Sequence, residues 1–204
     1  SQDMYDYILL EVKGTNTGFD AWCNSCEFTD FNSGYPLING NSNSTMGETG
    51  GTGNSIISVG AYTSKNSWTD LQGNSWSYSN AQVGDIASFS SLGPTVDGRT
   101  KPDVSAPGQV IVSSVSSFDN NYDSSSQSVV AEISSGSESW RFAQLQGTSM
   151  ASPMVAGIVA LWLEADPTLT PSEIKQLLQN NSTTDSYTGS APNNTWGYGK
   201  IDAH

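Results

Sequence analysis

Basic side chains are scarce in this sequence: 7 lysines and arginines stand against 20 acidic residues, and the formal net charge is −13. The phosphates of nucleic acids and of anionic lipid headgroups are bound by clustered Lys and Arg side chains. The composition therefore excludes a polyanion-binding protein, and we expect neither nucleic acid nor a membrane surface as a partner.

Long apolar runs are missing as well. The longest extends only from Met154 to Leu163, whereas a membrane-spanning helix needs roughly 20 apolar residues. The first residues are polar and acidic, so no signal peptide opens the chain. Because no Met starts the sequence and no tail follows its last residues, we expect it to be a fragment of a longer protein.

Cysteine is limited to Cys23 and Cys26. A redox pair would sit where a helix begins after a strand, and a zinc site would need two more thiolates or imidazoles. Neither context is present around these two residues. The alternatives left open are a small disulfide loop, or paired thiols without a catalytic role, and free thiols.

Serine, threonine, asparagine and glycine are abundant, which favours loops and short strands. The chain is nevertheless 35% hydrophobic and contains 6 Trp, 8 Tyr and 6 Phe, enough apolar bulk for a folded core. Its 204 residues fit one domain. An acidic, lysine-poor, Asn- and Ser-rich surface is common in exported proteins, so we expect an extracellular or cell-envelope location.

Strand patterns occupy the first two thirds of the sequence. Residues 5–12 and 19–22 predict a β-hairpin, and residues 24–54 predict a surface loop. Uncharged, β-branched segments then predict strands covered on both faces, as in a parallel sheet. Further strands are expected over residues 55–62, 109–115, 128–133 and 139–145, the last two as an antiparallel hairpin.

Helix patterns come at the end. The segment that begins near Ser149 is apolar on every side, from Met154 to Leu163, and such a helix is normally buried. Thr170 and Glu173 form a capping-box pattern with Pro171 at the first helical position, which predicts a second, superficial helix. Strands followed by helices indicate an α/β fold containing part of a mostly parallel sheet.

One segment suggests chemistry. Ser149 follows Gly147 where the apolar helix begins, so a nucleophilic hydroxyl there would have the unpaired N–H groups of the first turn beside it. Gly147 would allow a substrate to approach the backbone closely. Helix logic alone favours the other interpretation, that Ser149 is an ordinary N-cap residue, because Ser and Thr commonly precede helices.

A family resemblance favours the nucleophile. Residues 147–157 resemble the active-site serine segment of the subtilases, the subtilisin-like serine peptidases, with Met154 where the family often has a non-catalytic His. The resemblance implies the C-terminal part of a subtilase catalytic domain over residues 55–204, with 1–54 as a β-hairpin and loop insertion of the same single partial domain. Other blocks similar to the family, in family order, are 56–62, 89–95, 97–99, 101–108 and 196–203.

The resemblance implies a secreted serine endopeptidase that acts on protein or peptide substrates through an acyl-enzyme on Ser149. Subtilases use a triad in the chain order Asp, His, Ser. The only histidine here is His204, which follows the serine, so the triad Asp and His are expected upstream of this fragment. We expect the 204 residues alone to be inactive. Early residues not assigned to the triad or to the oxyanion hole are Asp3, Asp6, Asp20, Asn39 and Asn41.

Two alternatives remain: a sedolisin-like acid peptidase, and a pseudopeptidase that serves as a binding or regulatory module. No cofactor is expected. Asp103 matches a position that helps hold a weak cation in some subtilases, so a structural cation such as calcium is conceivable in the parent protein. A parallel sheet without its N-terminal strands would expose an edge, which predicts dimerisation of the fragment.

Overall fold

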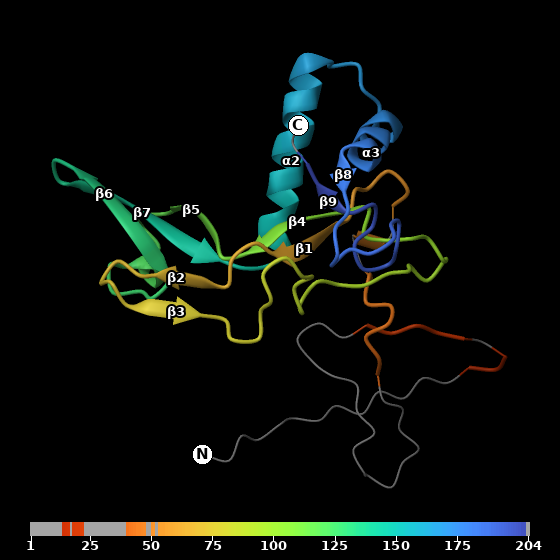
Figure 1. Ribbon diagram of the computed structural model, residues 1–204, viewed down its shortest axis with the longest axis horizontal. Helices are drawn as coiled ribbons and strands as arrows, with labels where there is room; N and C mark the ends of the chain where they lie inside the picture. The colour runs from red at the N-terminus through yellow and green to blue at the C-terminus, as the bar shows by residue number, and fades with distance from the viewer. Residues whose placement is uncertain (1–13, 17, 23–39, 48–49, 52, 203–204) are drawn as a thin grey trace, which may run out of the picture. The chain divides into compact units, whose positions relative to one another are not determined.

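The computed structural model describes residues 14–16, 18–22, 40–47, 50–51 and 53–202 (Figure 1). The chain divides into two compact units, Ser1–Asn39 and Gly40–His204. In the first unit, residues 19–22 are irregular and Phe19 is exposed, so the strand expected there is not formed. The expected strand over 5–12 and the two cysteines lie outside the described residues.

A four-stranded sheet forms the centre of the second unit. Its order is β1 (Val59–Thr63), β4 (Val104–Gln109), β9 (Lys200–Ile201) and β8 (Ser182–Thr183). β1, β4 and β9 run parallel, and β8 is antiparallel to β9. The predicted α/β fold with a parallel sheet is confirmed. The segment 105–108, Ser-Ala-Pro-Gly, has the composition of a turn, but it lies in the buried strand β4 between β1 and β9.

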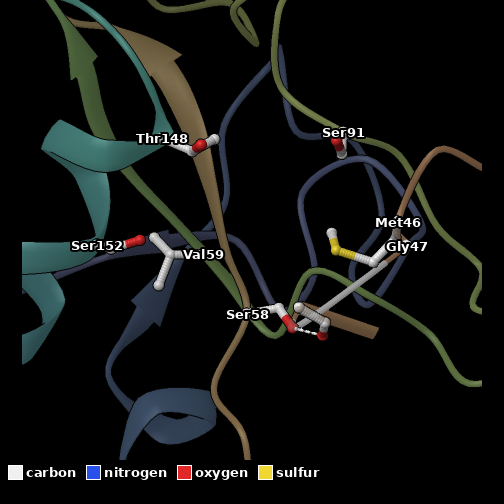
Figure 2. Close-up of a pocket in the computed structure, with 8 residues that line it drawn as sticks. Met46, Gly47, Ser58, Val59, Ser91, Thr148 and Ser152 are labelled. Carbon is white, nitrogen blue, oxygen red and sulfur yellow. Dashed lines mark hydrogen bonds between the residues drawn. The ribbon is translucent and has the colours of Figure 1, made fainter. Parts of the chain in front are cut away.

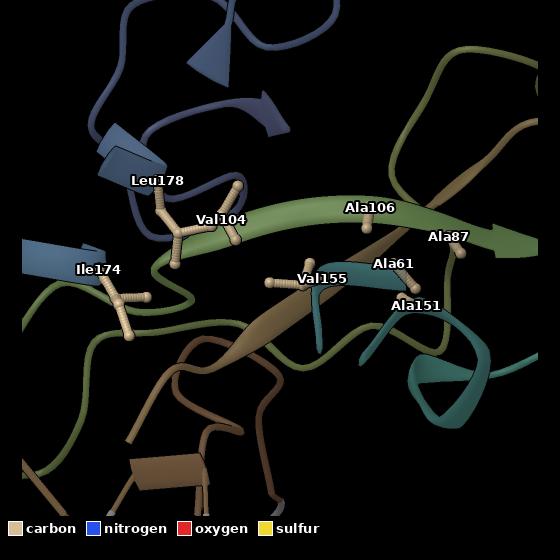
Figure 3. Close-up of a cluster of buried hydrophobic side chains, with 8 residues drawn as sticks. All are labelled: Ala61, Ala87, Val104, Ala106, Ala151, Val155, Ile174 and Leu178. Atoms are coloured by element: carbon tan, nitrogen blue, oxygen red, sulfur yellow. The ribbon is translucent and has the colours of Figure 1, made fainter. Parts of the chain in front are cut away.

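Two helices lie beside this sheet, α2 (Thr148–Ala165) and α3 (Pro171–Asn180). The capping box predicted for α3 is present, because Thr170 accepts from the backbone N–H of Glu173 while the Glu173 side chain accepts from the N–H of Thr170. α2 packs against β1 and β4 through small side chains. Figure 3 shows the buried cluster: Ala61, Ala87, Val104, Ala106, Ala151, Val155, Ile174 and Leu178.

The expectation that α2 is a buried helix is wrong for this chain. Only Ala151 and Val155 are buried, whereas Met154 is 41% exposed and Leu161 is 64% exposed. The reason is that its main contacts are with β1 and β4 on one side, and no layer of described residues covers its opposite side. By length and composition alone α2 could also cross a membrane, a property that core helices of water-soluble proteins share.

Two small antiparallel sheets extend from the core. One is a hairpin of β2 (Ser67–Thr69) and β3 (Ser75–Ser77), in which Trp68 lies opposite Trp76. The other has the order β5 (Ile111–Val115), β7 (Glu138–Leu145) and β6 (Val129–Ser135). The β6–β7 hairpin confirms the prediction, and η1 (Asn120–Tyr122) is a short 3-10 turn before it.

The segment 109–115 was expected to be a buried strand, but β5 is largely exposed. The core strand ends at Gln109, and the chain leaves the core sheet at the next residue. This residue, Val110, is buried and has a φ of +55°, a left-handed conformation that β-branched residues rarely adopt. The change of direction at Val110 carries β5 out of the parallel sheet into the small antiparallel one.

The hydrogen bonds of Asp97 predict that the unfolding free energy decreases at acid pH. Hydrogen bonds from Arg99 and then from Thr95 lower the pKa of Asp97 to about 2. Its pKa is thus below that of an unfolded Asp, about 3.9. The stabilisation is therefore present above about pH 4 and is lost as the pH falls toward about 2. Between about pH 4 and about pH 2, the Asp97→Asn variant should lose less unfolding free energy than the parent chain. The measurement is urea denaturation at each pH. Glu138→Gln, which removes an exposed carboxylate at the start of β7, is the control and should keep the original profile.

Candidate functional site

Ser149 is the second residue of α2, and its side chain is exposed. The helix begins after Gly147, whose φ of +144° belongs to the left-handed range that favours glycine. Gly147 has no side chain to cap the helix, so the first N–H groups of α2 remain available at the positive end of the helix dipole. An oxyanion that forms next to the Ser149 hydroxyl would meet these donors.

The core sheet holds the serine turn directly. The N–H of Gly147 donates to the carbonyl of Gly108 at the end of β4, at 2.8 Å. A Cβ at Gly108 would come within 2.4 Å of the Ala61 Cβ and within 3.1 Å of the Gly147 carbonyl oxygen. The lack of a side chain at Gly108 therefore lets the turn that carries Ser149 lie against β1 and β4.

A chain of buried side chains fixes the residue before Gly147. The Thr63 hydroxyl donates to Gln109 Oε1 at 2.6 Å, and Gln109 Nε2 donates to Gln146 Oε1 at 3.0 Å. Thr63 and Gln109 are both buried. Sequence reasoning missed this link, because nothing in the spacing of these residues shows that β1, β4 and the serine turn meet.

Pro153 lies inside α2, beyond its first turn. It has no N–H, so the Ser149 carbonyl cannot accept the usual bond from the residue four positions on. The first part of α2 is therefore less fixed by its own backbone hydrogen bonds than an uninterrupted helix would be. The packing of Ala151 and Val155 against the sheet compensates for this loss.

A pocket of about 240 Å³ opens beside the first turns of α2. Figure 2 shows Thr148 and Ser152 on one wall and Ser58 on the other, where the Ser58 hydroxyl donates to the carbonyl of Gly50. Among the described residues that line the pocket, none carries a charged side chain. Its lining residues are Met46, Gly47, Gly50, Ser58, Val59, Ser91, Thr148 and Ser152.

A proton acceptor for Ser149 is missing from the part of the chain that the structure describes. No histidine occurs there, and none of those residues forms a hydrogen bond with the Ser149 side chain. His204, Asp3, Asp6 and Asn39 lie outside the described residues. Asp20 is exposed in the first unit, and the exposed Asn41 accepts from the N–H of Asn43.

The Asp103 carboxylate contacts two lysines and a backbone N–H. Its Oδ2 accepts from the Ser58 N–H at 2.7 Å and from Lys101 Nζ at 2.5 Å, and its Oδ1 lies 3.5 Å from Lys175 Nζ. Burial lowers the pKa of the Lys101 amine, against the opposing effect of Asp103. In the described ranges, no group of three or more His, Cys, Asp or Glu side chains comes together as a metal site would require. Asp103 therefore ties the start of β4 to β1 and α3.

The contact of the serine turn with β4 gives a stability prediction. Gly108→Ala should destabilise the fold by about 1–3 kcal/mol, because the added Cβ overlaps Ala61 and forces the turn away. The measurement is the unfolding free energy from urea denaturation. Gly157→Ala is the matched control: its Cβ would meet nothing within 4 Å, and in a helix it should stabilise by up to about 1 kcal/mol. Equal stability of Gly108→Ala and the parent chain would contradict the assigned contact.

Comparisons with known proteins identify the family of this chain. A family model described as "Subtilase family" matches residues 24–199. Serine protease AprX of Bacillus subtilis is 43% identical over 120 residues, 58% of this chain and 24% of AprX. The C5a peptidase of Streptococcus pyogenes is 38% identical over 106 residues, 48% of this chain and 7% of that protein.

An uncharacterized protein of Aquifex aeolicus is 37% identical over 135 residues, 66% of this chain and 53% of that protein. The chain thus spans about half or less of the length of these curated relatives. Among solved structures, a protease of Pseudoalteromonas arctica aligns over 79% of this chain and 38% of its own, with a TM-score of 0.50 and 24% identity, a likeness of fold alone. On the match of the family model, which covers most of the sequence, the chain belongs to the subtilase family.

Proposed function

We propose that this chain carries the nucleophile of a serine endopeptidase, and that Ser149 forms the acyl-enzyme with a protein or peptide substrate. The observation that supports this most is the place of Ser149 in a subtilase chain: exposed, one residue into a helix whose N-cap is Gly147. The α3 helix also has a serine as its second residue, but Thr170 caps that helix, so its first turn is already occupied.

The chemistry follows from the surroundings of the hydroxyl. Ser149 Oγ attacks the carbonyl carbon of the scissile peptide bond, and the carbonyl oxygen becomes an oxyanion beside the N–H groups of the first turn of α2. The serine proton passes to an imidazole and then to the leaving amine, and water later hydrolyses the ester. The pocket lined by Thr148 and Ser152, whose described lining residues are uncharged, would receive a neutral group of the substrate.

The imidazole and the aspartate that orients it would come from polypeptide outside these 204 residues. The sequence contains a single histidine, His204, on the wrong side of Ser149 for the chain order of the family. A serine hydroxyl without an adjacent base is a weak nucleophile at neutral pH. The apolar side of α2, with Met154 and Leu161 exposed, offers a surface on which such a segment would pack.

An extracellular or cell-envelope location is part of this proposal. The chain is 36% identical over 117 residues to a relative named "Minor extracellular protease Vpr" of Bacillus subtilis. The strong excess of acidic over basic residues is compatible with an exported protein.

Covalent labelling with a fluorophosphonate probe tests the role of Ser149. We expect slow labelling of this chain, because loss of the histidine costs subtilisin about 10⁶-fold in kcat. Added imidazole should accelerate the labelling by supplying a base in solution. Mass spectrometry of the labelled peptide should locate the probe on Ser149.

Two variants and one reference enzyme control this experiment. Ser149→Ala should abolish labelling, whereas Ser172→Ala, at the equivalent second position of α3, should leave it unchanged. Intact AprX gives the rate of a complete subtilase. Labelling of the 204-residue chain at that rate, or labelling that survives in Ser149→Ala, would rule out the proposed assignment.

A further inference from the structure

The small sheet β5–β7–β6 has two unlike faces. Side chains alternate between the faces along each strand, and directly paired residues share a face. Ile133 pairs with Trp140, and these two lie on the same face as Phe142, because residues 140 and 142 are two apart in β7. Val112, which pairs with Gln144, belongs to this face as well. We call Val112, Ile133, Trp140 and Phe142 the outer face.

The outer face is apolar and open. Val112 is 48% exposed, Ile133 is 58% exposed and Trp140 is 47% exposed. Its other paired positions carry the uncharged side chains of Ser114, Ala131, Ser135 and Gln144, and one carboxylate, Glu138, at the end of the face next to the hairpin turn.

The opposite face of the same sheet is exposed at Ser113 and Ser134, and its central part is covered although it contains charged side chains. Arg141 donates to Glu132 at 2.6 Å and to the carbonyl of Tyr122 at 3.1 Å. Val129 and Ala143 on this face are buried. The β2–β3 hairpin adds two bonds, from the Leu71 N–H to the carbonyl of Val129 and from Trp68 Nε1 to the carbonyl of Gln127, each at 2.8 Å.

This arrangement reverses the usual order of an antiparallel sheet, whose apolar face packs on the protein and whose polar face meets water. An ion pair here lies on the packed side, and an isoleucine and a tryptophan lie on the side that faces solvent. A contiguous exposed apolar patch of this kind marks a binding surface.

A short stretch of chain connects the outer face to the serine turn. β7 ends at Leu145, and the chain then passes through Gly147 to Ser149. At about 3.3 Å per residue, Trp140 lies within roughly 30 Å of Ser149 along an extended chain. A substrate bound in extended form at Ser149 would therefore need fewer than about ten residues to reach Trp140.

Gln144 marks the end of the outer face that is nearest to Ser149. Its side-chain oxygen is buried and, within the described part of the chain, has no hydrogen-bond partner. A buried acceptor without a partner is unfavourable, because it has lost its hydrogen bonds to water. Such exceptions are uncommon in native proteins and call for a specific explanation.

We propose that the outer face binds the polypeptide substrate of Ser149 beyond the scissile bond, through apolar side chains at alternate positions of an extended segment. Trp140 and Phe142, two residues apart on β7, have the same side-chain spacing as alternate residues of an extended peptide. The net charge of −13 disfavours acidic segments, so the preferred substrate is neutral or basic and apolar. This inference extends the proposed function, because it concerns the substrate of the same serine.

Peptide binding tests the proposal without relying on catalysis. The probes are two fluorescein-labelled, uncharged decapeptides, one with Leu and Phe at alternate positions and one with Ser at those positions. The protein is the 204-residue chain with Ser149→Ala, and binding is measured by fluorescence anisotropy. We expect the apolar peptide to bind about tenfold or more tightly than the serine peptide, because it buries apolar surface on the outer face.

Variants locate the binding surface. Ile133→Ser combined with Trp140→Ser should weaken binding of the apolar peptide about tenfold, and Val112→Ser should weaken it less. Leu161→Ser, on the similarly exposed side of α2, should leave the dissociation constant unchanged. Circular dichroism establishes whether each variant is folded, and the single variant Val112→Ser serves if the double variant is not.

Three results would overturn the proposal: equal affinity for both peptides, equal weakening by Leu161→Ser, or loss of a dimer by light scattering in the Trp140→Ser variant alone. The last result would assign the outer face to a second copy of the chain. The fluorophosphonate experiment reports on Ser149 separately. Because binding is measured in the Ser149→Ala background, a failure of one experiment leaves the other informative.

Discussion

The hydrogen bond from Gly147 to Gly108 joins the end of a core strand to the start of a helix, and the candidate site depends on this contact. It can form only where the backbones approach closely, and small residues permit this approach: Ala61 on β1, Ala106 on β4 and Ala151 on α2 are all fully buried. Larger side chains at these positions would hold the helix away from the sheet. The position of the Ser149 hydroxyl is thus determined by side chains that take no part in chemistry.

The same packing leaves α2 incompletely covered. Its alanine side is fixed to β1 and β4, and Val159, Trp162 and Leu163 pack partly against the core, while Met154 and Leu161 are exposed. An apolar helix that is half exposed is stable only while its packed side compensates for the open one. The exposed apolar side of α2 and the lack of an imidazole among the described residues around Ser149 have a common explanation in the proposed function, since one upstream segment would supply both a cover and a base.

Local patterns predicted the parts of the fold whose stability is local. The capping box at Thr170 and the hairpin around Gly136 both depend on neighbouring residues, and both are present. The β2–β3 hairpin was missed, although Trp68 and Trp76 flank a turn in which Asp70 accepts four hydrogen bonds. Its short strands consist mostly of serine and threonine, which resemble loop composition.

Features that depend on tertiary contacts escaped the sequence. The segment containing Pro107 and Gly108 resembles a turn, yet it forms most of β4 because two parallel neighbours flank it. The burial of α2 was overestimated, since apolar composition does not show which neighbours the helix has. For the site, the glycine turn before a helix made Ser149 a candidate and the resemblance to the subtilases selected it. No sequence pattern indicated the amide link from Thr63 through Gln109 to Gln146.

Val110 separates the core sheet from the sheet that carries Trp140, and it is one buried residue in a left-handed conformation. A glycine at position 110 would allow many backbone conformations, whereas a β-branched side chain buried in the core allows very few. The core sheet therefore determines how the outer face of the small sheet is oriented. Substitutions on the outer face would therefore change the peptides that the proposed surface accepts without moving the Ser149 hydroxyl.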